Sequence, residues 1–325
     1  MKELLVGSAF FVGHKLLTAL AQLFVVATLV FSIMYLMPGD PVLLLLGAES
    51  NPTPAAIAAM RAKLGLDQPV LMQYFAWLGN ALHFDFGLSV LNSYPVANAI
   101  AANFPRTLEL GVAAIIIASL IGVPLGIAAA LHRGKALDTI LTSLATVGIS
   151  VPVYILGAMF IIVFSLQLGW LPSSGYMDIA RNMPEHFRRL TLPAVTLGFG
   201  LAASIARMTR SSMLEILNRD FIRALRAKGA SESRVIWRHA LRNASIPIVT
   251  IIGLQLGNLM GGTVLVEAMF NWPGLSTLLV EAVAKRDYPM VQGTVLTIAA
   301  LFIFINLGVE LLYSLLDPRI RQRRA

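Results

Sequence analysis

Long apolar runs alternate with short charged segments along this chain, and their lengths predict helices that cross a membrane. A helix of about 20 apolar residues spans the core of a bilayer. Six runs reach or approach this length: Leu16–Met37, Leu110–Leu131, Thr139–Leu166, Leu190–Ala206, Asn243–Val266 and Tyr288–Val309, the last prolonged to Leu316. The third run contains Pro152, where we expect a kink. The pattern therefore predicts an all-α integral membrane protein with six transmembrane helices.

The composition agrees with this fold class and narrows the chemistry. Of the 325 residues, 57% are hydrophobic and 13% are charged, whereas a soluble domain carries about 25% charged residues. The absence of cysteine excludes disulfides, a thiolate nucleophile and a cysteine-rich metal site. The five histidines are scattered without ligand spacing, so we expect no metal site and no cofactor. In a membrane protein the net charge of +8 indicates loop orientation and contact with anionic membrane lipid rather than with nucleic acid.

The distribution of Lys and Arg predicts the orientation in the membrane. With the N-terminus inside, the inner segments hold 17 of the 25 Lys and Arg residues and the outer segments hold eight. Cytoplasmic loops carry an excess of these residues, so both termini are predicted to lie inside. Residues 1–37 would then form the cytoplasmic N-terminus and first span, 38–105 a large external segment, 106–316 a five-span core, and 317–325 a cytoplasmic tail. Within the external segment we expect two short helices, at Thr53–Leu64 and Val70–Leu82.

The longest inner segment, residues 207–247, is strongly basic, with nine Lys and Arg residues against three acids. Its apolar residues recur at the spacing of one helix face: Leu214, Leu217, Phe221 and Leu225. Gly229 is placed to end this helix, and Ser231 to cap a second helix that reaches about Asn243. Three interpretations fit a helix–glycine–helix segment: a solvated loop that only sets topology, a DNA-binding helix-turn-helix, and a docking element for a cytoplasmic protein. The second is disfavoured because both ends enter the membrane within a few residues.

The sequence of residues 221–247, FIRALRAKGASESRVIWRHALRNASIP, resembles the EAA loop of ABC-importer permeases of the dipeptide, oligopeptide and nickel branch. It departs from the general pattern at Arg223, Leu225 and Ile246 and retains the glycine as Gly229. Further motifs agree in order along the chain: MPGDP at Met37–Pro41, KLGLDQP at Lys63–Pro69, DFGLS at Asp85–Ser89, GISVPVYILG at Gly148–Gly157, LGWLPSSG at Leu168–Gly175, LPAVTLGFGLAASIARMTRSSMLE at Leu192–Glu215, GLQLGNLMGGTVLVEAMFNWPGLSTLLVEAV at Gly253–Val283, RDYPMVQG at Arg286–Gly293 and LLYSLLDPRIR at Leu311–Arg321.

This resemblance implies a type I permease subunit of an ATP-driven importer in the cytoplasmic membrane of a bacterium or archaeon. Its expected partners are a sister permease, two cytoplasmic ABC ATPase subunits and an external substrate-binding protein that delivers di- or oligopeptides. Similar chains import nickel complexes, glutathione or oligosaccharides, and these cargoes stay open as alternatives. The chain lacks the phosphate-binding pattern G-x-x-x-x-G-K-[ST], so we expect a non-catalytic subunit. An ATP-independent channel or a secondary transporter is the alternative of a different class.

Two groups of residues are candidates for function. The resemblance implies an ATPase-coupling helix that fits a groove of one ATPase, formed by Phe221, Arg223, Ala224, Leu225, Arg226, Ala227, Lys228, Gly229 and Ser231. Polar residues inside predicted spans are candidates for the translocation path: Thr146, Ser150, Gln255, Asn258 and Glu267. The alternative for each of the latter is a hydrogen bond between helices. Glycines 257, 261 and 262 indicate close packing against another subunit.

Overall fold

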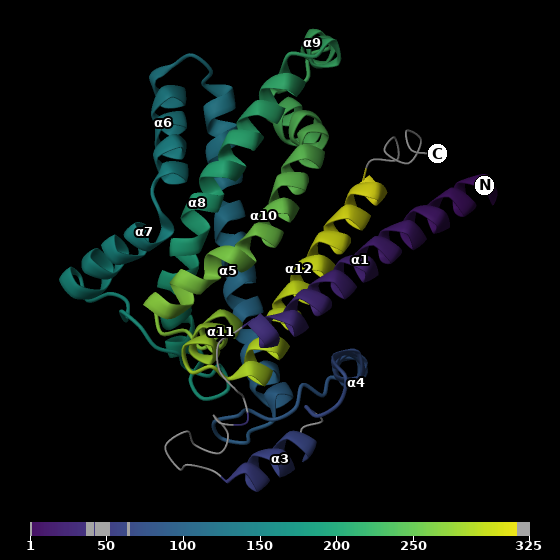
Figure 1. The fold of residues 1–325 in the computed structure, drawn as a ribbon. Helices are drawn as coiled ribbons and strands as arrows, with labels where there is room; N and C mark the ends of the chain where they lie inside the picture. Colours follow the sequence, from purple (N-terminus) through teal and green to yellow (C-terminus); the bar gives the residue numbers. More distant parts are fainter. Residues whose placement is uncertain (1, 37–41, 43–52, 64–65, 317–325) are drawn as a thin grey trace. The chain divides into compact units, whose positions relative to one another are not determined.

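A computed structural model describes residues 2–36, 42, 53–63 and 66–316 of the chain, and this part is built from helices (Figure 1). The whole MPGDP motif, parts of two other motifs and the tail 317–325 lie outside the described residues. The elements run in the order α1 (Lys2–Leu36), α3 (Pro54–Lys63), α4 (Val70–Leu82), α5 (Val96–Leu131), α6 (Ala136–Ser150), α7 (Val153–Phe160), η2 (Ile161–Gln167), α8 (Met183–Leu217), α9 (Asp220–Ala227), η3 (Arg234–Ala240), α10 (Leu241–Met269), α11 (Leu275–Ala284) and α12 (Tyr288–Leu316). Here η2 and η3 are π-helices.

Five helical stretches of the described chain are long and apolar enough to cross a membrane: Val12–Ser32, Val96–Leu131, Met183–Leu217, Arg234–Gly257 and Tyr288–Leu311. The fourth predicted run, Leu190–Ala206, is the middle of the much longer α8.

The third predicted span differs from expectation, because α6 and the helix formed by α7 and η2 are bent by 105° to each other. Pro152 disfavours helical backbone at Val151, which is extended at φ −79° and ψ 124°. The kink expected at Pro152 is thus a sharp break between two helices. The described chain has five segments long and apolar enough to cross a membrane, or six if the bent pair counts as one.

The chain divides into two compact units, of which the first comprises residues 1–13, 108–272 and 305–325. In this unit α8 packs against α6, α7 and α10 (Figure 1). Small residues let α5 approach α8 closely: a Cβ at Gly122 would lie 2.6 Å from the carbonyl oxygen of Ala202, and one at Gly126 would lie 2.5 Å from that of Ala206. Such small-residue contacts are typical of helix packing in membranes.

Gly257 also belongs to the first unit, and its close neighbour is in the same chain. A Cβ at this position would lie 2.8 Å from the side-chain oxygen of Asn306 on α12. Gly257 thus permits a close contact between α10 and α12 within the chain, and its packing against another subunit stays a prediction. A larger residue would collide with Asn306, which explains the need for glycine.

The second unit comprises residues 14–107 and 273–304 and contains both short helices predicted in the segment after the first span. Thr53 caps α3, since its hydroxyl accepts a hydrogen bond from the amide of Ala56 at 3.3 Å. Tyr74 of α4 lies against α1, where its hydroxyl is 2.8 Å from that of Thr28 and its ring contacts Phe31 edge-on.

A buried carboxylate joins two sequence motifs within the second unit. Asp287 is 3% exposed and precedes α12. It accepts hydrogen bonds from the hydroxyl of Ser89, from the amide of Val90 at 3.2 Å and from the amide of Met290 at 3.4 Å. The DFGLS motif is thereby fixed to the start of α12. Residues 198 positions apart in the sequence meet at this one side chain.

Candidate functional site

The basic segment begins inside α8 rather than after it. The apolar spacing predicted one helix from Leu214 to Leu225, but α8 ends at Leu217 and α9 begins at Asp220. Between them Arg219 is extended, at φ −74° and ψ 148°. The single-helix prediction is therefore wrong: the apolar residues are shared between the last turn of α8 and the short α9. Leu214, Leu217 and Leu225 still pack on one apolar cluster, because the break folds α9 back onto it.

The helix α9 is held by one fully buried side chain. Ile222 is 0% exposed and packs in a cluster of buried residues from α5, α8, α9, η3 and α10: Ile127, Ala130, Met213, Ile216, Val235, Ala240, Ala244 and Ile248. The sequence analysis did not single out Ile222. The available signal was an apolar side chain directly after Phe221 in an otherwise charged segment. Ile222 anchors α9 and leaves the other side free.

Of the nine predicted coupling residues, Leu225 is half-buried. The other eight are exposed around this anchor: Phe221, Arg223, Ala224, Arg226, Ala227, Lys228, Gly229 and Ser231. Phe221 is 39% exposed and Trp237 of η3 is 58% exposed. The segment thus presents apolar and cationic groups together on the surface of the described chain.

The turn after α9 has the backbone geometry of a Schellman motif. The amide of Ala230 donates to the carbonyl oxygen of Leu225 at 3.1 Å, and the amide of Gly229 donates to that of Arg226 at 2.9 Å. Gly229 has φ +80°, in the left-handed region that favours glycine. The prediction that Gly229 lies just past the helix with positive φ is confirmed. Nothing lies within 4 Å of a Cβ placed there, so the surrounding space is open.

A charged pair closes the same turn from the side. The guanidinium of Arg226 donates two hydrogen bonds to the carboxylate of Glu232, at 2.7 and 3.1 Å. The hydrogen bond from Arg226 lowers the pKa of Glu232, and the same bond raises the pKa of Arg226. Two further acids are paired locally, Glu215 with Arg219 at 2.6 Å and Asp220 with Arg223 at 3.3 Å.

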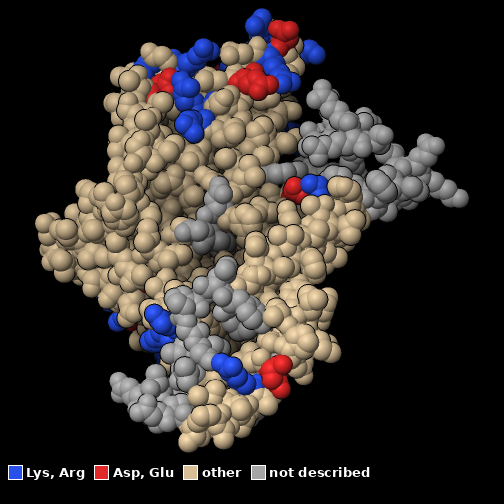
Figure 2. All heavy atoms as spheres, in the orientation of Figure 1, with Lys and Arg blue, Asp and Glu red and all other residues tan. Residues whose placement is uncertain are grey.

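Because these acids pair locally while the basic residues outnumber them, the end of the first unit that carries α9 is predominantly basic. Figure 2 shows Lys and Arg gathered there with fewer acids, above a broad surface without charged residues. This is the division expected at the boundary between membrane and water.

The second predicted helix begins where expected but does not stop near Asn243. It starts after Ser231 and continues through η3 and α10 to Met269, with Pro247 inside. The predicted end is therefore wrong. Its buried residues explain the continuation: Val235, Ala240, Ala244 and Ile248. The first interval is five residues, which equals the i→i+5 hydrogen-bond spacing of the π-helix η3, and all four residues pack in one cluster. Packing on α8 outweighs the hydrogen bond lost at the proline.

The five candidate path residues are not brought together in one cavity of the described chain. The hydroxyls of Thr146 and Ser150 are exposed on α6 and donate to carbonyl oxygens one turn earlier, each at 2.9 Å. Gln255 is half-buried on α10, the side chain of Asn258 lies outside the described residues, and Glu267 is fully buried. A cavity of about 360 Å³ at the α6–α7 bend has other residues in its lining, among them Gly148, Pro152, Thr196, Ser204 and Gly262.

A partly buried ion pair that the sequence analysis did not single out fixes α6 to α8. The guanidinium of Arg210 donates to both carboxylate oxygens of Asp138, at 2.6 and 2.8 Å. The same carboxylate accepts from the amide of Gly134 at 3.0 Å and from the hydroxyl of Thr142 at 3.3 Å. The Asp138 side chain is 8% exposed. Four donors thus satisfy one carboxylate, which ties the turn after α5 to α8.

Comparison with known proteins identifies the family. Residues 122–322 match the family described as "Binding-protein-dependent transport system inner membrane component", and residues 9–111 match its N-terminal component. The chain is 42% identical over 313 residues to the glutathione transport system permease protein GsiC of Escherichia coli (strain K12), covering 96% of this chain and 99% of that protein. It is 43% identical over 313 residues, with the same coverage, to GsiC of Salmonella choleraesuis (strain SC-B67).

Among solved structures, the MetNI methionine ABC transporter in an inward-facing conformation aligns with a TM-score of 0.56 and 22% identity, covering 67% of this chain and 96% of that chain. This likeness concerns the fold. The chain belongs to the binding-protein-dependent transport system inner membrane components, the multi-span permease subunits of ABC importers.

Proposed function

We propose that this chain forms, with a sister permease, the translocation path of an importer for glutathione or a closely similar short peptide. The observation that carries this proposal is the 42% identity to glutathione permeases over 96% of the chain. The relatives favour glutathione, one of the alternatives in the sequence analysis, over di- and oligopeptides in general. Two cytoplasmic ABC ATPase subunits and an external binding protein complete the proposed complex.

The proposed coupling site is α9 with the turn at Gly229. Its outer side is exposed and would fit a groove of one ATPase, while Ile222 and the Arg226–Glu232 pair hold it to the rest of the chain. The helix after the turn continues into α10 without a break. A push on α9 would therefore act on the cluster around Ile222 and move α8 and α10 together, as rigid elements do in domain motions.

The proposed path runs along α6 and α10. Thr146 and Ser150 expose their hydroxyls on α6, and Gln255 and Asn258 are three residues apart and so share a face of α10. Glu267 is buried in this structure and would reach the path only in another conformation. A path lined by neutral polar groups suits a hydrophilic peptide that must enter and leave.

The proposed topology has six spans, with the bent α6–α7 pair as the third, both termini inside and residues 38–105 outside. The excess of Lys and Arg in the inner segments supports it. Since the chain has no cysteine, single-cysteine variants at Ala58 and Lys228 give clean labels. An impermeant thiol reagent added to intact cells should modify Ala58→Cys and not Lys228→Cys; the reverse pattern would disprove the orientation.

Transport by the reconstituted complex tests the cargo. Proteoliposomes that contain this chain with its sister permease and ATPases, and the binding protein outside, should accumulate labelled glutathione when ATP is enclosed. An unrelated dipeptide and a nickel complex should be taken up much more slowly. Equal uptake without ATP would support the channel or secondary transporter instead. Preferential uptake of the dipeptide would overturn the glutathione assignment and leave the importer intact.

A further inference from the structure

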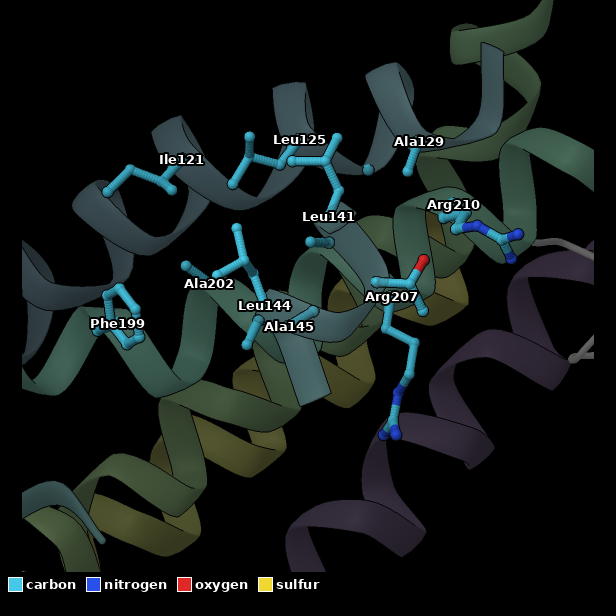
Figure 3. A pocket seen from close by; sticks show the side chains of 14 residues that line it. Ile121, Leu125, Ala129, Leu141, Leu144, Ala145, Phe199, Ala202, Arg207 and Arg210 are labelled. Atoms are coloured by element: carbon cyan, nitrogen blue, oxygen red, sulfur yellow. The ribbon is translucent and has the colours of Figure 1, made fainter. Parts of the chain in front are cut away.

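An apolar cavity of about 270 Å³ lies between α5, α6 and α8. Leu125 of α5, Leu144 of α6 and Phe199 of α8 face it, together with small residues such as Ala129, Ala145 and Ala202 (Figure 3). All three helices belong to segments that are long and apolar enough to cross a membrane, or to the bent pair. An apolar space of this kind is a poor site for water, which needs two or more polar partners. Within a bilayer, the chemistry that fits it is hydrocarbon.

One end of this cavity is basic. Arg207 and Arg210 of α8 are part of its lining, and Figure 3 shows the guanidinium of Arg207 extending beyond the apolar side chains. Arg210 is neutralised by its pair with Asp138. Arg207, in contrast, is exposed and has no acidic partner among the described residues. A cation therefore stands beside the apolar cavity with its charge uncompensated.

Two further cations belong to a turn that is bound to this end of the cavity. The turn that carries Arg133 and Lys135 is fixed there, because the amide of Gly134 between them donates to the carboxylate that binds Arg210. Both side chains are exposed, and neither has an acidic partner in the described part of the chain. The ion pair Asp138–Arg210 is neutral as a whole, so the surroundings carry an excess of three positive charges.

We propose that this cavity binds an anionic phospholipid, with one acyl chain between α5, α6 and α8 and the phosphate group at Arg207. An acyl chain joined to a negative group matches an apolar cavity with a cationic end, and a zwitterionic phospholipid matches only the apolar part. The site lies apart from the exposed side of α9. Its occupant would brace α6 against α8.

Photo-crosslinking tests the proposal with the intact transporter complex in detergent. The probe is phosphatidylglycerol that carries a diazirine in one acyl chain. It should label the cavity lining, with peptides containing Leu125 or Leu144 as the labelled products. Unlabelled phosphatidylglycerol should compete, and phosphatidylcholine should compete poorly. Arg207→Gln should weaken labelling about fivefold, since one cation at a membrane surface is worth about that factor.

Matched variants separate the cavity from its surroundings. Ala145→Phe fills the cavity and should abolish labelling, whereas Ser143→Phe, exposed on the same helix and outside the lining, should label as the wild type does. Arg219→Gln is the control for charge, since Arg219 is exposed and paired with Glu215. The proposal would be overturned if the two phospholipids competed equally and Arg207→Gln were labelled as strongly as the wild type. It would also be overturned if the probe labelled only helices other than α5, α6 and α8. Size-exclusion chromatography checks that each variant complex is assembled. If Ala145→Phe fails to assemble, Arg207→Gln still tests the proposal, because it changes a surface residue.

Discussion

Replacement of Gly229 by valine tests the coupling role of α9. Gly229 has φ +80°, and a left-handed conformation costs a residue other than glycine about 1–2 kcal/mol, with a β-branched side chain at the upper end. Nothing lies within 4 Å of the new Cβ, so no steric clash adds to this cost. About 2 kcal/mol corresponds to a roughly thirtyfold shift in a local equilibrium. The substitution should therefore weaken the two hydrogen bonds that end α9, which the amides of Gly229 and Ala230 donate.

The expected result is a normal amount of the chain in the membrane but loss of ATPase co-purification or of substrate-stimulated ATP hydrolysis, by about tenfold or more. Gly169→Val is the matched control, because Gly169 has φ +65° and equally open space around a Cβ, and it lies in the turn after η2. It should retain both properties. Normal ATPase recovery and normal transport by Gly229→Val would refute the coupling role, and loss of the chain from the membrane would show that the turn serves folding alone.

Three further predictions concern polar contacts. Arg226 lowers the pKa of Glu232, so their pair should stabilise the turn at pH values above the unfolded pKa of about 4.3 and lose this effect as pH falls through the lower folded pKa. Amide hydrogen exchange at α9 should therefore be faster in Glu232→Gln than in the wild type at neutral pH. The two proteins should exchange at the same rate in acid. Asp138→Asn should lower membrane content several-fold, measured by immunoblot, since it leaves the Arg210 pair broken; unchanged content would contradict this. Asp287→Ala should destabilise the complex by about 1–2 kcal/mol in thermal unfolding, since it removes a helix cap and a buried partner of two amides.

The sequence already contained the elements that depend on local chemistry. The apolar runs predicted the membrane helices, because a bilayer requires about 20 apolar residues for each crossing. Gly229 was placed correctly at the end of a helix, because the left-handed turn needed there excludes most other residues. The short helices α3 and α4 were also predicted, since each lies between turn-forming residues.

The errors arose where packing overrides a local signal. Pro152 was expected to kink one helix and instead separates two at 105°, while the helix expected to end near Asn243 continues past Pro247, which lies inside α10. The same residue type gives opposite results because the residues around Pro247 bury a continuous face on α8, whereas those before Pro152 are mostly exposed on α6. Such burial depends on the neighbouring helix and cannot be read from the proline.

The sequence by itself determined the class of protein, its membrane helices, the basic segment and the family resemblance, because these rest on composition, periodicity and contiguous motifs. Only the tertiary structure brought Asp138 to Arg210, Ser89 to Asp287, and Ile222 into the cluster beneath α9. Two of these contacts join residues 72 and 198 positions apart. No local pattern marks such partners, since the energy of a buried polar contact belongs to the pair and appears only when folding removes both groups from water.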